Sequence, residues 1–298
     1  MRYLIGLSAA AIIMGGGAML IHLGIYGLSL FLLIPVLLGA ISAFVYRPAT
    51  AGRGAEVGAA AVMIASLMLL GMGMEGLICV VMSWPLALPL GALGGWMAFR
   101  AANVRLTSGS VAMLILLPTA GVTWDVNAKP PLFDVRTSIE IAATPEQVWK
   151  HVVTFSDLEA PQEWYFRAGL AYPMRARIAG SGPGAVRYCE FSTGPFVEPI
   201  QIWEEPRLLR FSVTENPAPM HEWSPYAQVL PKHLNGYLVS KQGQFLLTPM
   251  PNGHTLLEGT TWYQHGLWPA KYWRWWSDAI IHRIHLRVLN HIRNLSEA

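Results

Sequence analysis

Charged residues are scarce in this sequence, and they are unevenly distributed. Only 13% of the 298 residues are charged, whereas 53% are hydrophobic. A soluble globular protein usually carries about a quarter charged residues. Residues 1–123 contain seven charges, five positive and two negative, and therefore hold the whole net charge of +3. This composition excludes a disordered chain, and a positive excess confined to the apolar half gives no reason to expect a nucleic-acid partner.

Cysteine is nearly absent, which limits the metal and disulfide chemistry that we expect. Cys79 lies in an apolar segment and Cys189 in a predicted strand, so we expect no internal disulfide. Because there is no cysteine cluster, the sequence excludes a thiolate zinc site, and we expect no metal and no cofactor. Asp278, His282 and His285 would share one face of a helix. We interpret them as a polar stripe in which Asp278 pairs with His282.

Long apolar runs fill the first 123 residues and predict a transmembrane domain. A helix needs about 20 apolar residues to cross a bilayer. Four further apolar runs argue that the first run is a retained helix and not a cleaved signal peptide. The predicted spans cover about 3–21, 27–46, 58–74, 76–98 and 107–122.

The positive charges of this half predict its orientation. Lys and Arg concentrate in cytoplasmic loops, and five spans with the N-terminus inside place both basic loops in the cytoplasm. We therefore expect a multi-pass protein of the inner (cytoplasmic) membrane whose C-terminal domain is periplasmic or extracytoplasmic. The basic residues are Arg47 and Arg53 in the loop 47–57, and Arg100 and Arg105 in the loop 99–106.

The membrane half carries little that indicates transport. Glu75 stands in a glycine-flanked turn at 74–76, and we interpret it as an interfacial turn carboxylate. Gly91, Gly94 and Gly95 form a surface suited to close helix packing. We expect this domain to anchor and assemble the protein.

The second half predicts an α+β domain, residues 133–298, after a linker at 124–132. Phe133–Ala142 alternates as a strand, and Thr144-Pro145-Glu146-Gln147 is typical of a helix start. A second short helix is expected around 162–170. Turn residues separate six further predicted strands, at 174–180, 185–193, 196–204, 207–214, 234–248 and 254–264.

A long amphipathic helix is predicted from Pro269 to Leu295. Its polar residues occupy the surface opposite an apolar stripe. An antiparallel sheet around a long C-terminal helix satisfies this order of elements. The stripe comprises Trp273, Ile280, Ile284, Val288, Ile292 and Leu295, flanked by Trp276 and Ile281.

The stretch TSIEIAATPEQVWKHVV, followed by FSDLEAPQEW, resembles the opening strand and first helix of the START-like (SRPBCC) superfamily, with an aromatic residue at Trp149. This superfamily includes polyketide cyclases, lipid-transfer domains and birch-pollen allergens. The resemblance covers about residues 133–295 and depends mainly on element order. Three further stretches resemble a bacterial membrane-anchored branch: FSTGPFVEPIQIWEEP, GQFLLTPMPNGHTLLEGTTWY and YWRWWSDAIIHRIHLRVL. The resemblance to the START-like superfamily implies a helix-grip fold with a large apolar cavity between the sheet and the last helix.

The expected function is membrane-anchored binding, transfer or sensing of a hydrophobic ligand such as a lipid or isoprenoid. We expect the proline-rich loop 215–233 to be the lid of the cavity. Aromatic side chains either fill the core or line the cavity. The candidate ligand-binding residues are Trp203, Tyr237, Trp262, Trp273, Trp276, Ile280 and Ile284.

Two alternatives remain open. The first is a cyclase or hydrolase that uses a carboxylate or histidine in the same cavity, because burial there would raise the pKa of an acid. Strand acids could instead face solvent in cross-strand pairs with Arg187, Arg210 or Lys241. The second is a non-catalytic module that binds a protein partner. The candidate catalytic residues are Glu190, Glu198, His233 and Glu258.

Overall fold

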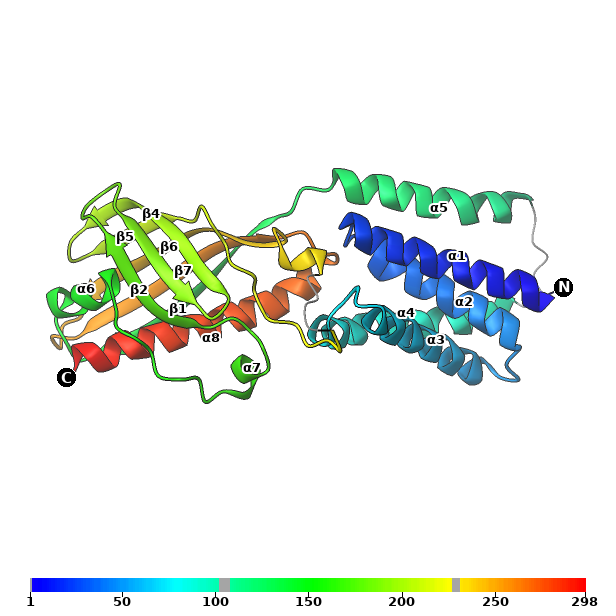
Figure 1. The fold of residues 1–298 in the computed structure, drawn as a ribbon, viewed down its shortest axis with the longest axis horizontal. Coiled ribbons are helices and arrows are strands. Elements are labelled where there is room, and N and C mark those ends of the chain that lie inside the picture. Colours follow the sequence, from blue (N-terminus) through cyan, green and yellow to red (C-terminus); the bar gives the residue numbers. More distant parts are fainter. Residues whose placement is uncertain (1, 102–107, 227–230) are drawn as a thin grey trace. The chain divides into compact units, whose positions relative to one another are not determined.

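The computed structural model describes residues 2–101, 108–226 and 231–298 (Figure 1). The chain forms two compact units, and each is described here by itself. The first unit comprises Met1–Lys129, Glu222–His233 and Gly266–Pro269, and the second comprises Pro130–His221, Leu234–His265 and Ala270–Ala298.

The first unit is helical. Four segments in the described part of the chain are long and apolar enough to cross a membrane: Gly6–Leu23, Ser29–Tyr46, Ala51–Gly71 and Leu77–Arg100. They belong to α1 (Arg2–Leu23), the π-helix η1 (Ser29–Leu33) continuing into α2 (Ile34–Tyr46), α3 (Ala51–Gly71) and α4 (Leu77–Arg100).

The predicted fifth span is a helix, α5 (Ser108–Asn127), but it is not among these four. Pro118, Trp124 and Asp125 make it less apolar, so the predicted count of five is corrected to four. The Asp125 carboxylate accepts hydrogen bonds from the backbone N–H of Leu28 (2.7 Å) and Ser29 (2.8 Å). The last turn of α5 therefore lies where the second apolar segment begins. Arg105 lies outside the described residues.

The helix α3 begins earlier than the sequence predicts. The Thr50 hydroxyl accepts a hydrogen bond from the backbone N–H of Arg53 (3.2 Å), which caps the helix at residue 50 and not near 58. Arg53 consequently lies in the first turn of α3. As predicted, α4 packs through small residues, since a Cβ at Gly94 would collide with the Val36 backbone of α2.

The second unit contains a seven-stranded antiparallel sheet in the described part of the chain. Its strand order is β1-β7-β6-β5-β4-β3-β2, so the first strand pairs with the last. The strands are β1 (Leu132–Ile141), β2 (Pro173–Ala179), β3 (Val186–Phe191), β4 (Gly194–Glu204), β5 (Leu208–Ser212), β6 (Leu238–Pro249) and β7 (Thr255–His265).

Two short helices and one long helix complete this unit. The helix α6 (Pro145–Val153) starts with the capping box formed by Thr144 and Gln147, and α7 covers only Trp164–Arg167. The helix α8 (Ala270–Ser296) lies along the sheet (Figure 1). Leu209, Leu247 and Leu257 of the sheet pack with Leu289 and Ile292 of α8 in the main core. Sheet and helix together are consistent with the helix-grip expectation.

Candidate functional site

A cavity of about 140 Å³ lies between the sheet and α8 in the second unit. Most of its lining is apolar and comes from strands β3 to β7 and from α8. Phe196, Phe211 and Phe245 line the sheet side, and Ile280 and Ile284 line the helix side. The alternation of side chains along the strands directs these rings inward.

An ion pair is buried among these aromatic rings. Arg187 of β3 and Glu198 of β4 are cross-strand partners and hydrogen bond to each other, with only 1% and 6% of their surfaces exposed. The Arg187 Nε also donates to the carbonyl oxygen of Val153 (3.3 Å). Its guanidinium carbon lies 5.5 Å from the ring centres of Phe155 and Phe211. The predicted pairing with Arg187 is confirmed, but the pair faces the interior and not solvent.

Burial controls the ionisation of the groups around this pair. Desolvation raises the pKa of Glu198 above its usual value, although the Arg187 guanidinium opposes the shift. Desolvation also raises the pKa of the neighbouring Cys189 thiol to about 12. Cys189 therefore stays a neutral thiol at physiological pH and is poorly suited to act as a nucleophile.

His285 of α8 adds a neutral polar group to the cavity wall. Its Nε2 shares a hydrogen bond with the Thr261 hydroxyl (2.8 Å), and its Nδ1 shares one with the Thr137 hydroxyl (3.1 Å). Burial lowers its pKa to about 4, with a smaller contribution from His282. His285 is therefore neutral near pH 7 and can act as a hydrogen-bonding group without carrying charge.

The first part of the loop predicted to be the lid contributes to the lining of this cavity. Residues 216–219 line it, and the Pro219 carbonyl oxygen accepts a hydrogen bond from the Ala171 N–H (3.0 Å). The His221 N–H donates to the Gly169 carbonyl oxygen (2.8 Å). Residues 222–233 belong to the first unit instead, and residues 227–230 lie outside the described residues.

The four candidate catalytic residues are distributed over different environments. Glu198 lines the cavity. Glu190 forms ion pairs with Arg175 and Arg177 on the neighbouring strand β2, which lower its pKa. Glu258 of β7 does not line the cavity, and its carboxylate accepts a hydrogen bond from the Thr260 hydroxyl (3.3 Å). His233 belongs to the first unit.

Only Ile280 and Ile284 of the seven candidate ligand-binding residues line the cavity. Trp203 packs against the main core, with its ring edge-on to Trp149 at 5.8 Å. Trp262 lies beneath the Arg210 guanidinium, 5.9 Å from its ring centre. The remaining three candidates are Tyr237, which is half-buried, Trp273, which is buried, and Trp276, whose ring contacts Trp275.

The polar stripe on α8 does not form the predicted internal pair. Asp278 accepts hydrogen bonds from the Tyr263 hydroxyl (2.5 Å) and the Arg274 Nε (3.0 Å), so its predicted pairing with His282 is wrong. His282 shares a hydrogen bond with the Thr137 hydroxyl (2.7 Å). The sheet, and not the helix itself, supplies most of the partners for these side chains.

Sequence reasoning missed Arg187 and His285 as cavity residues. Arg187 alternates with Cys189 and Phe191 along β3, so it stands on the same strand face as two buried residues. This alternation was a usable signal for a buried cation. His285 carries no comparable signal, because the sequence does not indicate where the threonines of β1 and β7 meet α8.

Comparisons with known proteins place the chain in no family. No family model and no curated protein matches the sequence. Among solved structures, a protein of Nitrosospira multiformis is 16% identical, with a TM-score of 0.35, over 54% of this chain and 94% of that one. Norcoclaurine synthase from Thalictrum flavum is 11% identical, with a TM-score of 0.36, over 57% and 96% of the two chains. An aromatase/cyclase from a Streptomyces species is 14% identical, with a TM-score of 0.35, over 56% and 94%. Similarities of this size carry no information about function.

Proposed function

We propose that the second unit binds an apolar small molecule in the cavity between the sheet and α8. The observation that carries the proposal is the cavity itself, whose largely apolar lining includes four phenylalanine and three isoleucine side chains. An apolar guest gains the contacts that such a lining lacks.

The cavity volume limits the size of the guest. About 140 Å³ is close to the roughly 150 Å³ of an apolar cavity that binds benzene, and it is below the roughly 300 Å³ at which sites for drug-sized ligands begin. We therefore expect a single ring or a comparable hydrocarbon segment to fit. A whole lipid or isoprenoid would need the segment 216–219 to move outward.

The buried polar groups define which atoms such a guest should carry. Glu198 and Arg187 add an acceptor and a donor to the lining, whereas both ring nitrogens of the neutral His285 already share hydrogen bonds with Thr261 and Thr137. A buried polar group is stabilised only when it is paired. A ring with one hydroxyl or carbonyl group satisfies both the apolar and the polar part of the wall.

The setting of this binding unit is proposed to be a membrane. Four apolar helices of the first unit have the length and composition for crossing it. The last turn of α5, near Asp125, lies at the start of the second apolar segment, and unit two begins soon after. With the N-terminus inside, the second apolar segment starts on the outer side. Four crossings return the chain to the cytoplasmic side after α4, so this placement requires the less apolar α5, whose last turn hydrogen bonds to the start of that segment, to run back to the outer side. The second unit is therefore proposed to be periplasmic or extracytoplasmic.

A binding experiment on the full chain in lipid nanodiscs tests the cavity. Native mass spectrometry with phenol, a single ring with one hydroxyl, as the probe should detect one bound molecule per chain. Ile284→Trp should abolish binding, because the indole fills the cavity. Arg283→Trp places the same side chain on an exposed position of α8 and should bind like the wild type. Absence of binding to the wild type, or equal binding by both variants, would contradict the proposal and favour a protein-interaction module.

Catalysis at Glu198 is the second candidate function. A carboxyl group with a raised pKa inside an apolar cavity is suited to general acid–base chemistry. Incubation of the full chain with phenyl acetate as the probe ligand, followed by mass spectrometry, separates the two functions. Recovery of an unchanged ligand supports binding alone. Conversion that stops in Glu198→Gln, while the ligand still binds, supports an enzyme.

A further inference from the structure

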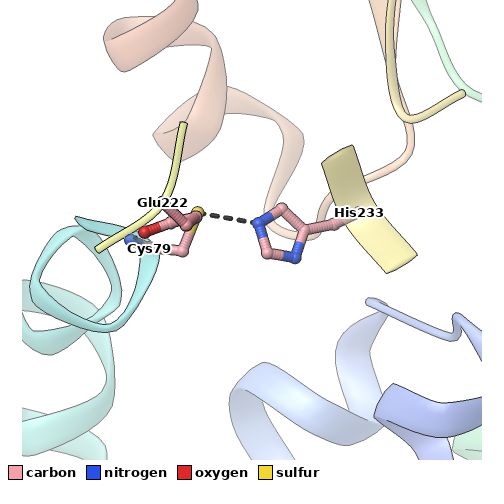
Figure 2. Close-up of side chains that lie close together, drawn as sticks. All are labelled: Cys79, Glu222 and His233. Carbon is pink, nitrogen blue, oxygen red and sulfur yellow. Dashed lines mark hydrogen bonds between the residues drawn. The ribbon is translucent and has the colours of Figure 1, made fainter. Parts of the chain in front are cut away.

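Three side chains with metal-binding atoms meet at the start of α4 in the first unit. Cys79 lies in the first turn of the helix, Glu222 comes from the loop after β5, and His233 comes from the 3-10 helix η3 (Lys232–Leu234) (Figure 2). One ligand atom from each lies within 4.8 Å of the others. The Cys79 Sγ lies 2.7 Å from the His233 Nε2.

Glu222 is held in place by the backbone of the helix. Its carboxylate accepts hydrogen bonds from the N–H groups of Ile78 (2.9 Å) and Cys79 (3.0 Å). An anion at a helix N-terminus is favoured by the free N–H groups and the helix dipole. Gly76 is required for this approach, because a Cβ there would collide with the carboxylate.

His233 is oriented by a second carboxylate. Its Nδ1 lies 3.3 Å from the Glu75 Oε2, and the Tyr26 hydroxyl donates to the Glu75 Oε1 (2.7 Å). His233 and Glu75 are only 8% and 7% exposed. Glu75 therefore lies in the predicted turn but is buried and paired. Metal-binding histidines almost always direct their second ring nitrogen at a carboxylate, carbonyl or water in this way.

The charges around Cys79 favour a bound cation over a catalytic thiol. A thiolate beside the Glu222 carboxylate, with Glu75 behind His233, would gather negative charge in a small buried volume. Glu222 also occupies the backbone N–H groups that could otherwise stabilise an oxyanion. A divalent cation balances the charge of one thiolate and one carboxylate.

We propose that Cys79, Glu222 and His233 form a binding site for a divalent transition-metal ion of the zinc type. Thiolate, imidazole and carboxylate are the ligands that zinc uses in proteins, and three protein ligands leave the fourth tetrahedral position to water. Binding displaces the Cys79 thiol proton to solvent. The Sγ and Nε2 atoms must separate to about 3.5 Å, because the zinc–ligand bonds are about 2.3 and 2.0 Å.

The proposed site departs from the sequence-based exclusion of a thiolate zinc site. The exclusion considered only cysteine clusters, whereas this ligand set contains a single cysteine. The ligands are also remote in sequence, since Cys79 is 143 residues from Glu222 and 154 from His233. A metal here would fasten Glu222 and His233 to the start of α4.

Cobalt binding to the full chain in detergent tests the site directly. The protein is stripped with a chelator under reducing conditions and titrated with Co²⁺. One equivalent should give a thiolate-to-cobalt absorption band in the near ultraviolet and visible bands typical of tetrahedral cobalt, and one equivalent of Zn²⁺ should bleach both. The Cys79→Ser variant should lose the ultraviolet band. The His233→Asn variant should no longer bind one equivalent of Co²⁺. His22→Asn, which changes an exposed histidine of α1, should retain both.

Glu75→Gln distinguishes a metal site from a merely packed cluster. Loss of the carboxylate behind the histidine should weaken Co²⁺ affinity by about 10–100-fold while leaving one ion per chain. The proposal is overturned if the wild type binds no stoichiometric Co²⁺, or if Cys79→Ser binds it with the same spectrum. Circular dichroism and phenol binding on the same samples report folding and the cavity, so this outcome is independent of the proposed ligand function.

Discussion

A charged pair inside an apolar cavity costs more desolvation energy than an apolar pair of similar size. Arg187 and Glu198 hydrogen bond to each other, and the guanidinium is surrounded by the rings of Phe155, Phe211 and Phe245. Such a pair holds together well once formed, yet it adds little net stability compared with well-packed hydrophobic residues. Stability therefore does not account for its presence in the cavity, and the proposed ligand binding gives the pair a role.

We expect the two single replacements of this pair to be far worse than the double one. Arg187→Met or Glu198→Leu alone leaves a buried charge unpaired and should lower the free energy of unfolding by about 3–5 kcal/mol. The double variant should recover most of the loss. Tryptophan fluorescence during chemical unfolding measures the free energy of unfolding of each variant, since ten of the twelve tryptophans lie after residue 123. A double variant as unstable as either single one would contradict this account.

His285 should make the second unit sensitive to acid. Its pKa is about 4 in the folded state against an ordinary 6.5, so the unfolded chain takes up this proton first as the pH falls. The free energy of unfolding is therefore unaffected by the protonation of this group above pH 6.5. It decreases by about 3 kcal/mol as the pH falls from 6.5 toward 4. Subtracting the unfolding free energies of His285→Gln from those of the wild type across this range isolates the effect. A difference in unfolding free energy that does not change with pH would contradict this role of His285.

At the scale of single elements, α8 supplies both a wall of the cavity and a large part of the core. Val288, Leu289 and Ile292 are buried in the main core, and Ile284 packs against it while facing the cavity. The exposed side of the helix carries Arg283, which makes a contact with the Tyr165 ring at 5.2 Å. The neighbouring positions 283 and 284 therefore lie on different faces of α8, the first exposed and the second facing the cavity.

The pair of variants Ile284→Asp and Arg283→Ala tests this assignment of faces. The aspartate places an unpaired charge among apolar groups and should lower the free energy of unfolding by about 3 kcal/mol or more. The Arg283 change should shift it by less than about 1 kcal/mol. Thermal melts followed by circular dichroism compare them. Equal melting temperatures for Ile284→Asp and the wild type would mean that the stripe was assigned to the wrong face.

Local sequence signals predicted most elements of the second unit. Turn residues such as those at 249–253 separate β6 from β7, and Thr144 with Gln147 marks the start of α6. The last helix was predicted to within a residue at each end. These features depend on neighbours in sequence, so a single chain reveals them.

The parts of the candidate sites that were missed depend on distant residues. The aromatic candidates were chosen for size, and five of the seven candidate ligand-binding residues do not line the cavity, because strand alternation and the path of α8 decide which rings face inward. His233 was identified as a chemical candidate, but its neighbours Cys79 and Glu75 lie more than 150 residues earlier in the chain. No local sequence pattern indicates that these residues lie close together in the fold.

At the scale of the whole molecule, the side on which the second unit lies is open to a direct test. A reporter enzyme active only outside the cytoplasm, fused after Ala298, should be active, because the positive charges favour a cytoplasmic N-terminus. A fusion after Arg100 should be inactive and serves as the control for the opposite side. Activity of a cytoplasmic reporter at Ala298 would reverse the proposed topology, and α5 would then not cross the membrane.

The division of the chain between the two units also has a consequence for biosynthesis. Residues 222–233 and 266–269 complete the first unit, although they are made after most of the second. His233 follows Cys79 by 154 residues, which ribosomes translate in about 8–30 s at 5–20 residues per second. Until these residues are made, the start of α4 lacks Glu222 and His233, and Tyr26 lacks the backbone hydrogen bond from Trp268. The first unit of this protein is thus the first to be synthesised and among the last to be finished.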